Sequence, residues 1–229
     1  MKHPKKPPQK KMEKKQQWVV TSGAVVLSNI LGLLSLRGPM EMSFSLSALP
    51  IFLISLTMGW EAGYAVGVLG GITQALQYGS FWYIFYTGIL GAVSGHFAKN
   101  HKLNRKWGGV LFSVGVFFMF WWIILANQSR LISESLVILT ALLAFTAIEY
   151  TLIKKHLTHN PLLNLTLAGC AGAAAYIPYD LLVMGVAQGY NALQGFVVLS
   201  KDLIQDYLAA IAAAVILQHK SARKLLNLK

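Results

Sequence analysis

The feature that most constrains this chain is a succession of long apolar runs, which follow one another after Gln17 with only short polar breaks. The 229-residue sequence is 55% apolar and only 12% charged. Runs that approach about 20 apolar residues are long enough for a helix to cross a bilayer. The sequence therefore predicts an all-α fold, a polytopic transmembrane helical bundle with about eight helices.

The apolar runs define the expected helices and a single membrane domain. They lie near 18–36, 44–58, 61–77, 82–98, 108–126, 132–153, 163–187 and 197–218. The second and third runs are short, so a broken helix or a re-entrant pair is an alternative there. We expect one transmembrane domain over 18–218. Residues 1–17 are basic, polar and proline-containing, which predicts a disordered cytoplasmic tail, and 219–229 form a second basic tail.

The basic residues are distributed asymmetrically over the breaks and tails. With a cytoplasmic N-terminus, the cytoplasmic loops and the C-terminal tail hold Lys99, Lys102, Arg105, Lys106, Lys154, Lys155, Lys220, Arg223, Lys224 and Lys229. Only Arg37, Arg130 and Lys201 fall outside. This positive-inside pattern predicts an even number of spans in the cell membrane with both termini cytoplasmic. The net charge of +12 is a topology signal, so no nucleic-acid partner is expected.

Small residues recur at helical spacing in two regions. In the stretch SALPIFLISLTMGWEAGYAVGVLGGITQ, glycines stand four apart at Gly59, Gly63, Gly67 and Gly71, and the next run carries Gly88, Gly91 and Gly95. Such strips allow close helix packing in lipid. The first run repeats the spacing with Ala24, Ser28 and Gly32. There, internal packing and docking of a partner both remain open.

Three acidic residues inside the apolar runs require a partner or a function, because an ionisable group in a membrane costs about 2.5 to 3.5 kcal/mol. Asp180 follows Pro178, at which a broken helix would free backbone groups. Asp202 and Asp206 are four apart, hence on one helix face. By the expected topology, all three lie in the outer half of the bundle.

Aromatic and polar residues near these aspartates complete a candidate small-molecule site that opens to the outside. The candidate ligand-binding residues are Glu41, Tyr83, Tyr86, Tyr176, Tyr179, Asp180, Asp202, Gln205 and Asp206. Two other interpretations remain open: Trp82 as an interfacial anchor, and Asp202 as a helix-dipole residue. The histidines lack metal-ligand spacing, so no metal and no cofactor is expected.

Two stretches resemble the substrate-binding S components of energy-coupling-factor vitamin transporters. LSALPIFLISLTMGWEAGYAVGVLGGITQ, after a helix with an A-x-x-x-S-x-x-x-G face, resembles their second and third helices, and LIQDYLAAIAAAVILQHK is similar to their last helix. The resemblance covers roughly the first 100 and the last 65 residues. It implies a six-helix core, to which this chain adds a pair of helices over 108–153.

The resemblance also implies a function. The chain would capture a vitamin from outside and pass it to a coupling subunit that meets Ala24, Ser28 and Gly32. Two ATPase subunits would supply the energy, since the chain has no G-x-x-x-x-G-K-[ST] loop. The three acids and the many aromatics fit a flat, partly cationic molecule such as thiamin, with riboflavin or folate as alternatives. Tyr83 stands where the thiamin subfamily carries an acidic residue.

Two other classes of function are weaker alternatives. A stand-alone secondary transporter of a small organic solute would be favoured by inverted repeats, and the two halves show no convincing similarity. A membrane enzyme, such as an intramembrane protease or a lipid-modifying transferase, would need a catalytic motif. The chain has no H-E-x-x-H, and AVSG at 92–95 lacks the leading glycine of a serine-protease motif. We therefore expect no enzymatic activity.

Overall fold

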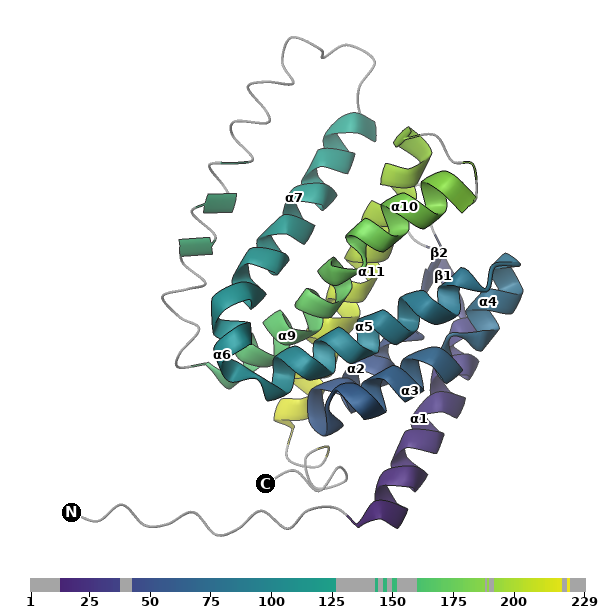
Figure 1. Ribbon diagram of the computed structural model, residues 1–229, viewed down its shortest axis with the longest axis vertical. Helices are drawn as coiled ribbons and strands as arrows, with labels where there is room; N and C mark the ends of the chain where they lie inside the picture. Colours follow the sequence, from purple (N-terminus) through teal and green to yellow (C-terminus); the bar gives the residue numbers. More distant parts are fainter. Residues whose placement is uncertain are drawn as a thin grey trace, which may run out of the picture.

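The structure is a computed structural model, and it describes residues 13–37, 43–126, 143, 146–147, 150–151, 160–187, 189, 192–219 and 222. The described chain is almost entirely helical, so the all-α prediction is confirmed (Figure 1). Its elements are α1 (Lys14–Leu33), β1 (Ser35–Arg37), β2 (Ser43–Ser45), α2 (Ala48–Met58), α3 (Trp60–Gly70), α4 (Ile72–Tyr78), α5 (Trp82–Lys99), α6 (His101–Leu103), the π-helical η2 (Asn104–Gly108), α7 (Gly109–Ala126), α9 (Pro161–Ala175), α10 (Ile177–Ala187) and α11 (Ala192–Gln218).

The helices coincide with the expected spans, with a few informative differences. α1 begins at Lys14 rather than at residue 18, and the expected loop at 99–107 is helical through α6 and η2. β1 and β2 form an antiparallel pair with Leu36 opposite Phe44, just before α2. Most of the expected span at 132–153, and with it most of the second helix of the expected inserted pair, lies outside the described residues.

Two of the expected spans are each split into two helices. The third is interrupted at Gly71, between α3 and α4, and the seventh at Tyr176, between α9 and α10. Pro178 explains the second break, because it has no N–H with which to continue the hydrogen-bond ladder of α9. The chain resumes one turn later, where the Asp180 amide donates to the Tyr176 carbonyl at 2.8 Å.

α5 lies near the centre of the bundle, between α3 and α2 on one side and α9 on the other (Figure 1). α11 packs against α9, α2 and α7. α1 covers α2 and α3, whereas α7 covers α9 and α11. Helices from the start and the end of the chain therefore meet around α5 and α9.

The contact between α3 and α5 is made by glycines. A Cβ on Gly63 would lie 2.4 Å from the Gly91 carbonyl oxygen, and a Cβ on Gly67 would lie 2.1 Å from the Thr87 carbonyl oxygen. A Cβ on Gly95 would meet the backbone of Gly59 at 2.4 Å. The backbones thus touch directly, as the glycine spacing predicts, and the packing role of both strips is confirmed.

The small-residue face of α1 is also internal. Ala24, Ser28 and Gly32 are the buried residues of this helix. Ser28 Oγ donates a hydrogen bond to the Ser47 carbonyl at 2.8 Å. A Cβ on Gly70 would lie 2.6 Å from Ser28 Oγ. Of the two interpretations left open by the sequence, these contacts support packing within the chain. A coupling subunit could reach this face only if α1 left α2 and α3.

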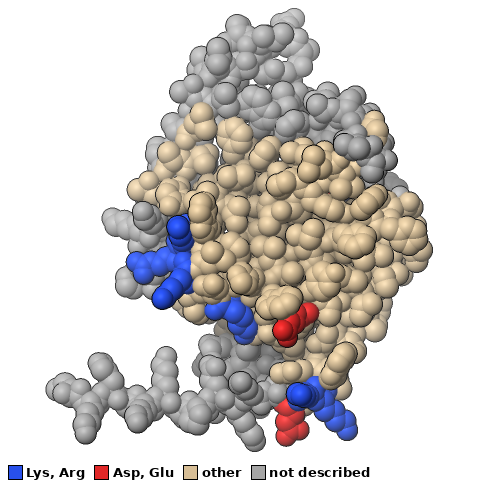
Figure 2. Space-filling model, viewed as in Figure 1, with Lys and Arg blue, Asp and Glu red and all other residues tan. Residues whose placement is uncertain are grey.

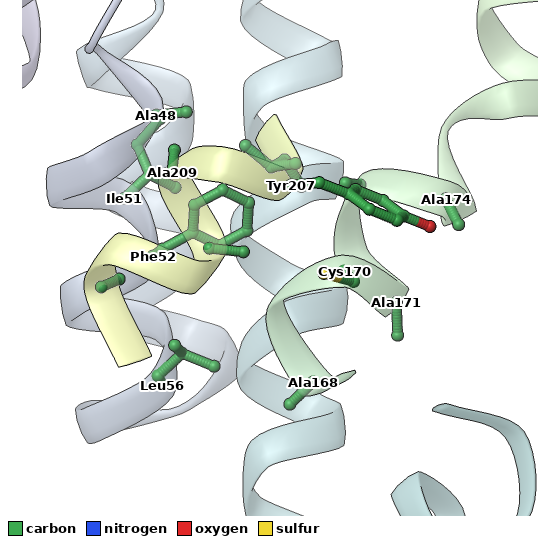
Figure 3. Close-up of a cluster of buried hydrophobic side chains, with 14 of the residues drawn as sticks. Ala48, Ile51, Phe52, Leu56, Ala168, Cys170, Ala171, Ala174, Tyr207 and Ala209 are labelled. Carbon is green, nitrogen blue, oxygen red and sulfur yellow. The ribbon is translucent and has the colours of Figure 1, made fainter. Parts of the chain in front are cut away.

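Small residues also surround the largest apolar side chains of the core. Phe52 of α2 lies beside α9 and α11, where the facing residues are small (Figure 3). A Cβ on Gly169 would come within 2.7 Å of the Ala210 Cβ. Cys170 is buried here as a free thiol, in keeping with a packing role. Alanine and glycine on α9 and α11 therefore allow these helices to pack closely.

The exterior separates charged from apolar residues. Among the described side chains, the exposed Lys, Arg, Asp and Glu residues are Glu13, Lys14, Lys15, Glu61, Lys99, Lys102, Arg105 and Lys106. In Figure 2 the blue and red atoms lie at mid-height on the left and toward the lower end, and the tan surface above them shows no charged atoms in this view. The rest of the exterior has many exposed apolar side chains, including Leu27 on α1, Phe85 on α5 and Leu208 on α11.

Length and composition identify one helical run among the described residues that is able to cross a membrane. This run, Pro161–Val183, comprises 23 residues with a mean hydropathy of 1.2, and 61% of its most apolar window is buried within the bundle. It combines α9 with the first part of α10. The shorter apolar helix Ala48–Met58 corresponds to α2.

Candidate functional site

Five buried side chains, from three helices and from the break between α9 and α10, form the candidate site, which we name the aspartate–tyrosine cluster. It consists of Tyr86 of α5, Tyr176 between α9 and α10, Asp180 of α10, and Asp202 and Asp206 of α11. The exposed fractions are 7% for Tyr86, 0% for Tyr176, 4% for Asp180, 8% for Asp202 and 1% for Asp206. The cluster is thus a group of polar side chains in an interior that otherwise consists largely of small and apolar residues.

The two tyrosines hold the centre of the cluster. The Tyr86 hydroxyl donates a short hydrogen bond to Asp206 Oδ2. The Tyr86 and Tyr176 rings pack edge to face, with their centroids 4.3 Å apart. Such contacts fix the ring orientations and add to the burial of apolar area. Tyr86 therefore connects the central helix α5 to both the kinked α9–α10 segment and α11.

Three polar atoms of the cluster have no hydrogen-bond partner among the described residues. They are the Tyr176 hydroxyl, Asp180 Oδ2 and Asp206 Oδ1, and each is buried. A buried polar group without a partner costs about 1 to 3 kcal/mol. Unpaired groups are rare in folded proteins, so three in one cluster call for an explanation. The cost is consistent with a site that completes its hydrogen bonds with another molecule.

The carboxyl groups of the cluster lie close enough to interact electrostatically. Asp180 interacts with both Asp202 and Asp206, and Tyr176 interacts with all three aspartates. Lys201 lies near Asp202 and offsets part of its charge. Among the described residues, no ion pair is formed with Asp180 or Asp206. The cluster thus brings three carboxyl groups together in the interior.

Aromatic residues continue from the cluster to the surface of the bundle. Tyr83 is partly buried, and its ring centroid lies 6.2 Å from that of Tyr86. The Tyr179 hydroxyl donates a hydrogen bond to the Trp82 carbonyl at 3.0 Å, and the centroids of the two rings lie 6.5 Å apart. Trp82 is exposed, as an interfacial anchor would be. A path of aromatic side chains therefore leads outward from Tyr86.

Gln205 connects α11 to the β1–β2 hairpin. Its side-chain oxygen accepts a hydrogen bond from the Ser45 amide at 2.8 Å. Ser45 is separated from Gln205 by 160 positions, and no motif in the sequence pairs the two. The hairpin is thereby held against the helix that carries Asp202 and Asp206.

The sequence-predicted residues can now be placed. Tyr86, Tyr176 and the three aspartates converge, Tyr83 and Tyr179 border them, and Gln205 faces the hairpin. Glu41 lies outside the described residues. Within the described chain, no three His, Cys, Asp or Glu side chains are arranged to hold a metal ion.

Comparisons with known proteins add no relatives. No protein-family model, curated protein or solved structure matches this chain. The resemblance to S components therefore depends on the quoted stretches, and the geometry of the site has to carry the functional argument.

Proposed function

We propose that this chain is a polytopic membrane protein and that its charged end faces the cytoplasm. The exposed large apolar side chains on α1, α3, α5, α10 and α11 support the membrane location, because in a bilayer they would contact lipid. The interior supports it too, since helix packing through glycine and alanine with a few buried polar groups is typical of membrane bundles. The helix count of eight and the cytoplasmic termini belong to the same proposal.

The proposed topology puts the aspartate–tyrosine cluster in the outer half of the bundle. Tyr86 lies in the second turn of α5, and Lys99 is the last residue of that helix. At 1.5 Å per residue, the two are separated by about 20 Å along the helix axis. The cluster is therefore far from the basic end and near the end that would face the outside.

Within this topology, we propose that the chain is the substrate-binding subunit of an importer that resembles energy-coupling-factor transporters. The observation that carries the proposal is the buried cluster with its three unpartnered polar atoms. An ionisable group within a membrane bundle marks a binding or transport site by default. The ligand would be a vitamin or a related micronutrient. A coupling subunit and two ATPase subunits would provide transport, and the cluster would bind rather than catalyse.

The decisive experiment for this proposal is native mass spectrometry of the gently extracted protein. We expect a retained small molecule together with a coupling subunit and ATPases. Tyr176→Phe should release the small molecule and keep the partners, because it changes only the cluster. A wild-type protein without ligand and without partners would contradict the proposal.

The membrane orientation has a separate test with engineered cysteines. Gln77 lies exposed on α4 and Lys102 lies exposed on α6, at opposite ends of the bundle. A membrane-impermeant thiol reagent should label Gln77→Cys in whole cells and Lys102→Cys only after lysis. The buried Cys170 provides a low background. Labelling of both variants in intact cells would overturn the orientation.

A stand-alone secondary transporter is the second candidate, and one observation favours it. The break between α9 and α10 at Tyr176 lies directly beside buried carboxyl groups, and discontinuous helices commonly form the substrate and ion sites of secondary transporters. Uptake by the purified chain alone in lipid vesicles would support this candidate. Ligand binding without uptake would support the importer subunit.

A further inference from the structure

The aspartate–tyrosine cluster has an excess of buried acceptors over positive charge. Asp180 Oδ2 and Asp206 Oδ1 are without hydrogen-bond partners in the described part of the chain. Lys201 is partly buried and interacts with Asp202. No Lys or Arg among the described residues forms an ion pair with Asp180 or Asp206. A positive charge placed between these two carboxyl groups would relieve their mutual repulsion, and a protonated nitrogen could also donate hydrogen bonds to both free oxygens.

The tyrosines point to the same kind of ligand independently of the carboxyl groups. The Tyr176 hydroxyl is fully buried, lacks a partner and interacts electrostatically with all three aspartates. The rings of Tyr83, Tyr86 and Tyr176 lie in sequence, with neighbouring centroids 6.2 Å and 4.3 Å apart. Aromatic faces attract cations, and tyrosine-lined sites are a common means of recognising quaternary nitrogen.

An anionic ligand fits this chemistry poorly. A phosphate or carboxylate in the cluster would face three carboxyl groups, and the free hydroxyl of Tyr176 would be the one unpartnered donor among these residues. Like charges in a buried site repel each other strongly. A neutral ligand would leave the repulsion between the carboxyl groups unchanged.

We propose that the ligand of the aspartate–tyrosine cluster is an organic cation, whose protonated or quaternary nitrogen lies between Asp180 and Asp206 against the rings of Tyr86 and Tyr176. This inference rests on the proposed binding function and adds the substrate class. The carboxyl groups supply the charge that selects the ligand, and the aromatic path from Trp82 to Tyr86 leads it inward.

The test compares probes of the same shape and different charge. Choline and its neutral carbon isostere dimethylbutanol form one pair, the N-methylated cation of nicotinamide and nicotinamide form another, and benzoate is the anion. Binding to the purified full-length protein is measured by isothermal calorimetry. The cation of each pair should bind at least about tenfold more tightly than its neutral counterpart.

Two variants test whether the preference for cations comes from the aspartate–tyrosine cluster. Asp206→Asn should weaken cation binding about tenfold or more and leave the binding of the neutral probes unchanged. Glu61→Gln removes the same charge from an exposed position on α3 and should change nothing. If Asp206→Asn does not fold, Asp180→Asn replaces it, because Asp180 Oδ2 has no hydrogen-bond partner among the described residues.

The outcomes separate this inference from the proposed function. If the neutral probes or benzoate bind best and Asp206→Asn abolishes that binding, the cation class is overturned and the binding site stands. If Glu61→Gln weakens binding as much as Asp206→Asn, the preference comes from overall charge and the inference is overturned. If no probe binds and the extracted protein retains no small molecule, the inference and the proposed function both fail.

Discussion

Two faces of α5 differ in how they pack against their neighbours. One face carries Gly91 and Gly95 and meets α3 so closely that backbone touches backbone. Another face carries Tyr86 and meets α10 and α11 across polar groups that are left without partners. The glycine contact leaves no space for a side chain. The cluster is buried, and its hydrogen bonds are incomplete. The comparison indicates that the glycine contact provides stability and that the cluster gives up stability for binding.

The largest expected effect comes from filling the glycine contact. Gly67→Leu puts a side chain where the Cβ itself would already lie 2.1 Å from the Thr87 carbonyl oxygen. α3 and α5 would have to separate, at a cost of about 3 kcal/mol or more. We expect little folded protein by size-exclusion chromatography in detergent. A monodisperse variant with wild-type thermal stability would show that this contact does not hold the bundle.

The next effect tests the small-residue face of α1. Ser28→Leu removes the hydrogen bond to the Ser47 carbonyl and forces a large side chain against Gly70, at a cost of about 2 to 3 kcal/mol. Thermal unfolding should therefore shift to a clearly lower temperature. Val26→Ala, on the exposed face of the same helix, is the control and should leave stability nearly unchanged. A stable Ser28→Leu protein that has lost only its partners would restore the docking interpretation.

A smaller effect is expected inside the cluster. Tyr86→Phe removes the donor to Asp206 Oδ2 from a buried carboxyl group whose other oxygen, Oδ1, already has no hydrogen-bond partner among the described residues. The free energy of unfolding should fall by about 1 to 3 kcal/mol, and ligand affinity should fall with it. Denaturant titration together with calorimetry measures the two effects. Unchanged stability would mean that the Tyr86 hydroxyl contributes nothing to the folded state.

The smallest effect calibrates the glycine contact. Gly23 lies on α1, and a Cβ there would meet nothing within 4 Å. Gly23→Ala should stabilise the helix by about 0.5 to 1 kcal/mol, because alanine loses less backbone entropy. A gain in thermal stability contrasts with Gly67→Leu and would show that helix glycines matter here through position. A loss as large as that of Gly67→Leu would contradict the steric explanation.

Much of the fold could be predicted because helix periodicity repeats every few residues. The spacing of Gly63 and Gly67 placed both on one face, and the structure has them against α5. The four-residue spacing of Asp202 and Asp206 likewise put both carboxyl groups on one face of α11. The cost of burying a carboxyl group selected Asp180 as their companion. Each of these inferences uses only local geometry or a single transfer energy.

The remaining features depend on contacts between distant segments, which local patterns do not encode. Spacing identified the small-residue face of α1 and could not decide whether its neighbour was α3 or another protein. The hydrogen bond from Ser45 to Gln205 joins two segments with no shared motif. The shortness of the third run allowed a broken helix there, but no proline marks Gly71 as its position, unlike the break before Pro178.

The most direct test of the central claim is the stability and ligand retention of Tyr176→Phe. This variant removes a buried hydroxyl that has no hydrogen-bond partner and keeps the ring that packs on Tyr86. If the cluster is incomplete in order to bind a ligand, the ligand-free variant should be as stable as the wild type or about 1 kcal/mol more stable, and it should lose its ligand. A variant that is less stable and still retains its ligand would contradict the account.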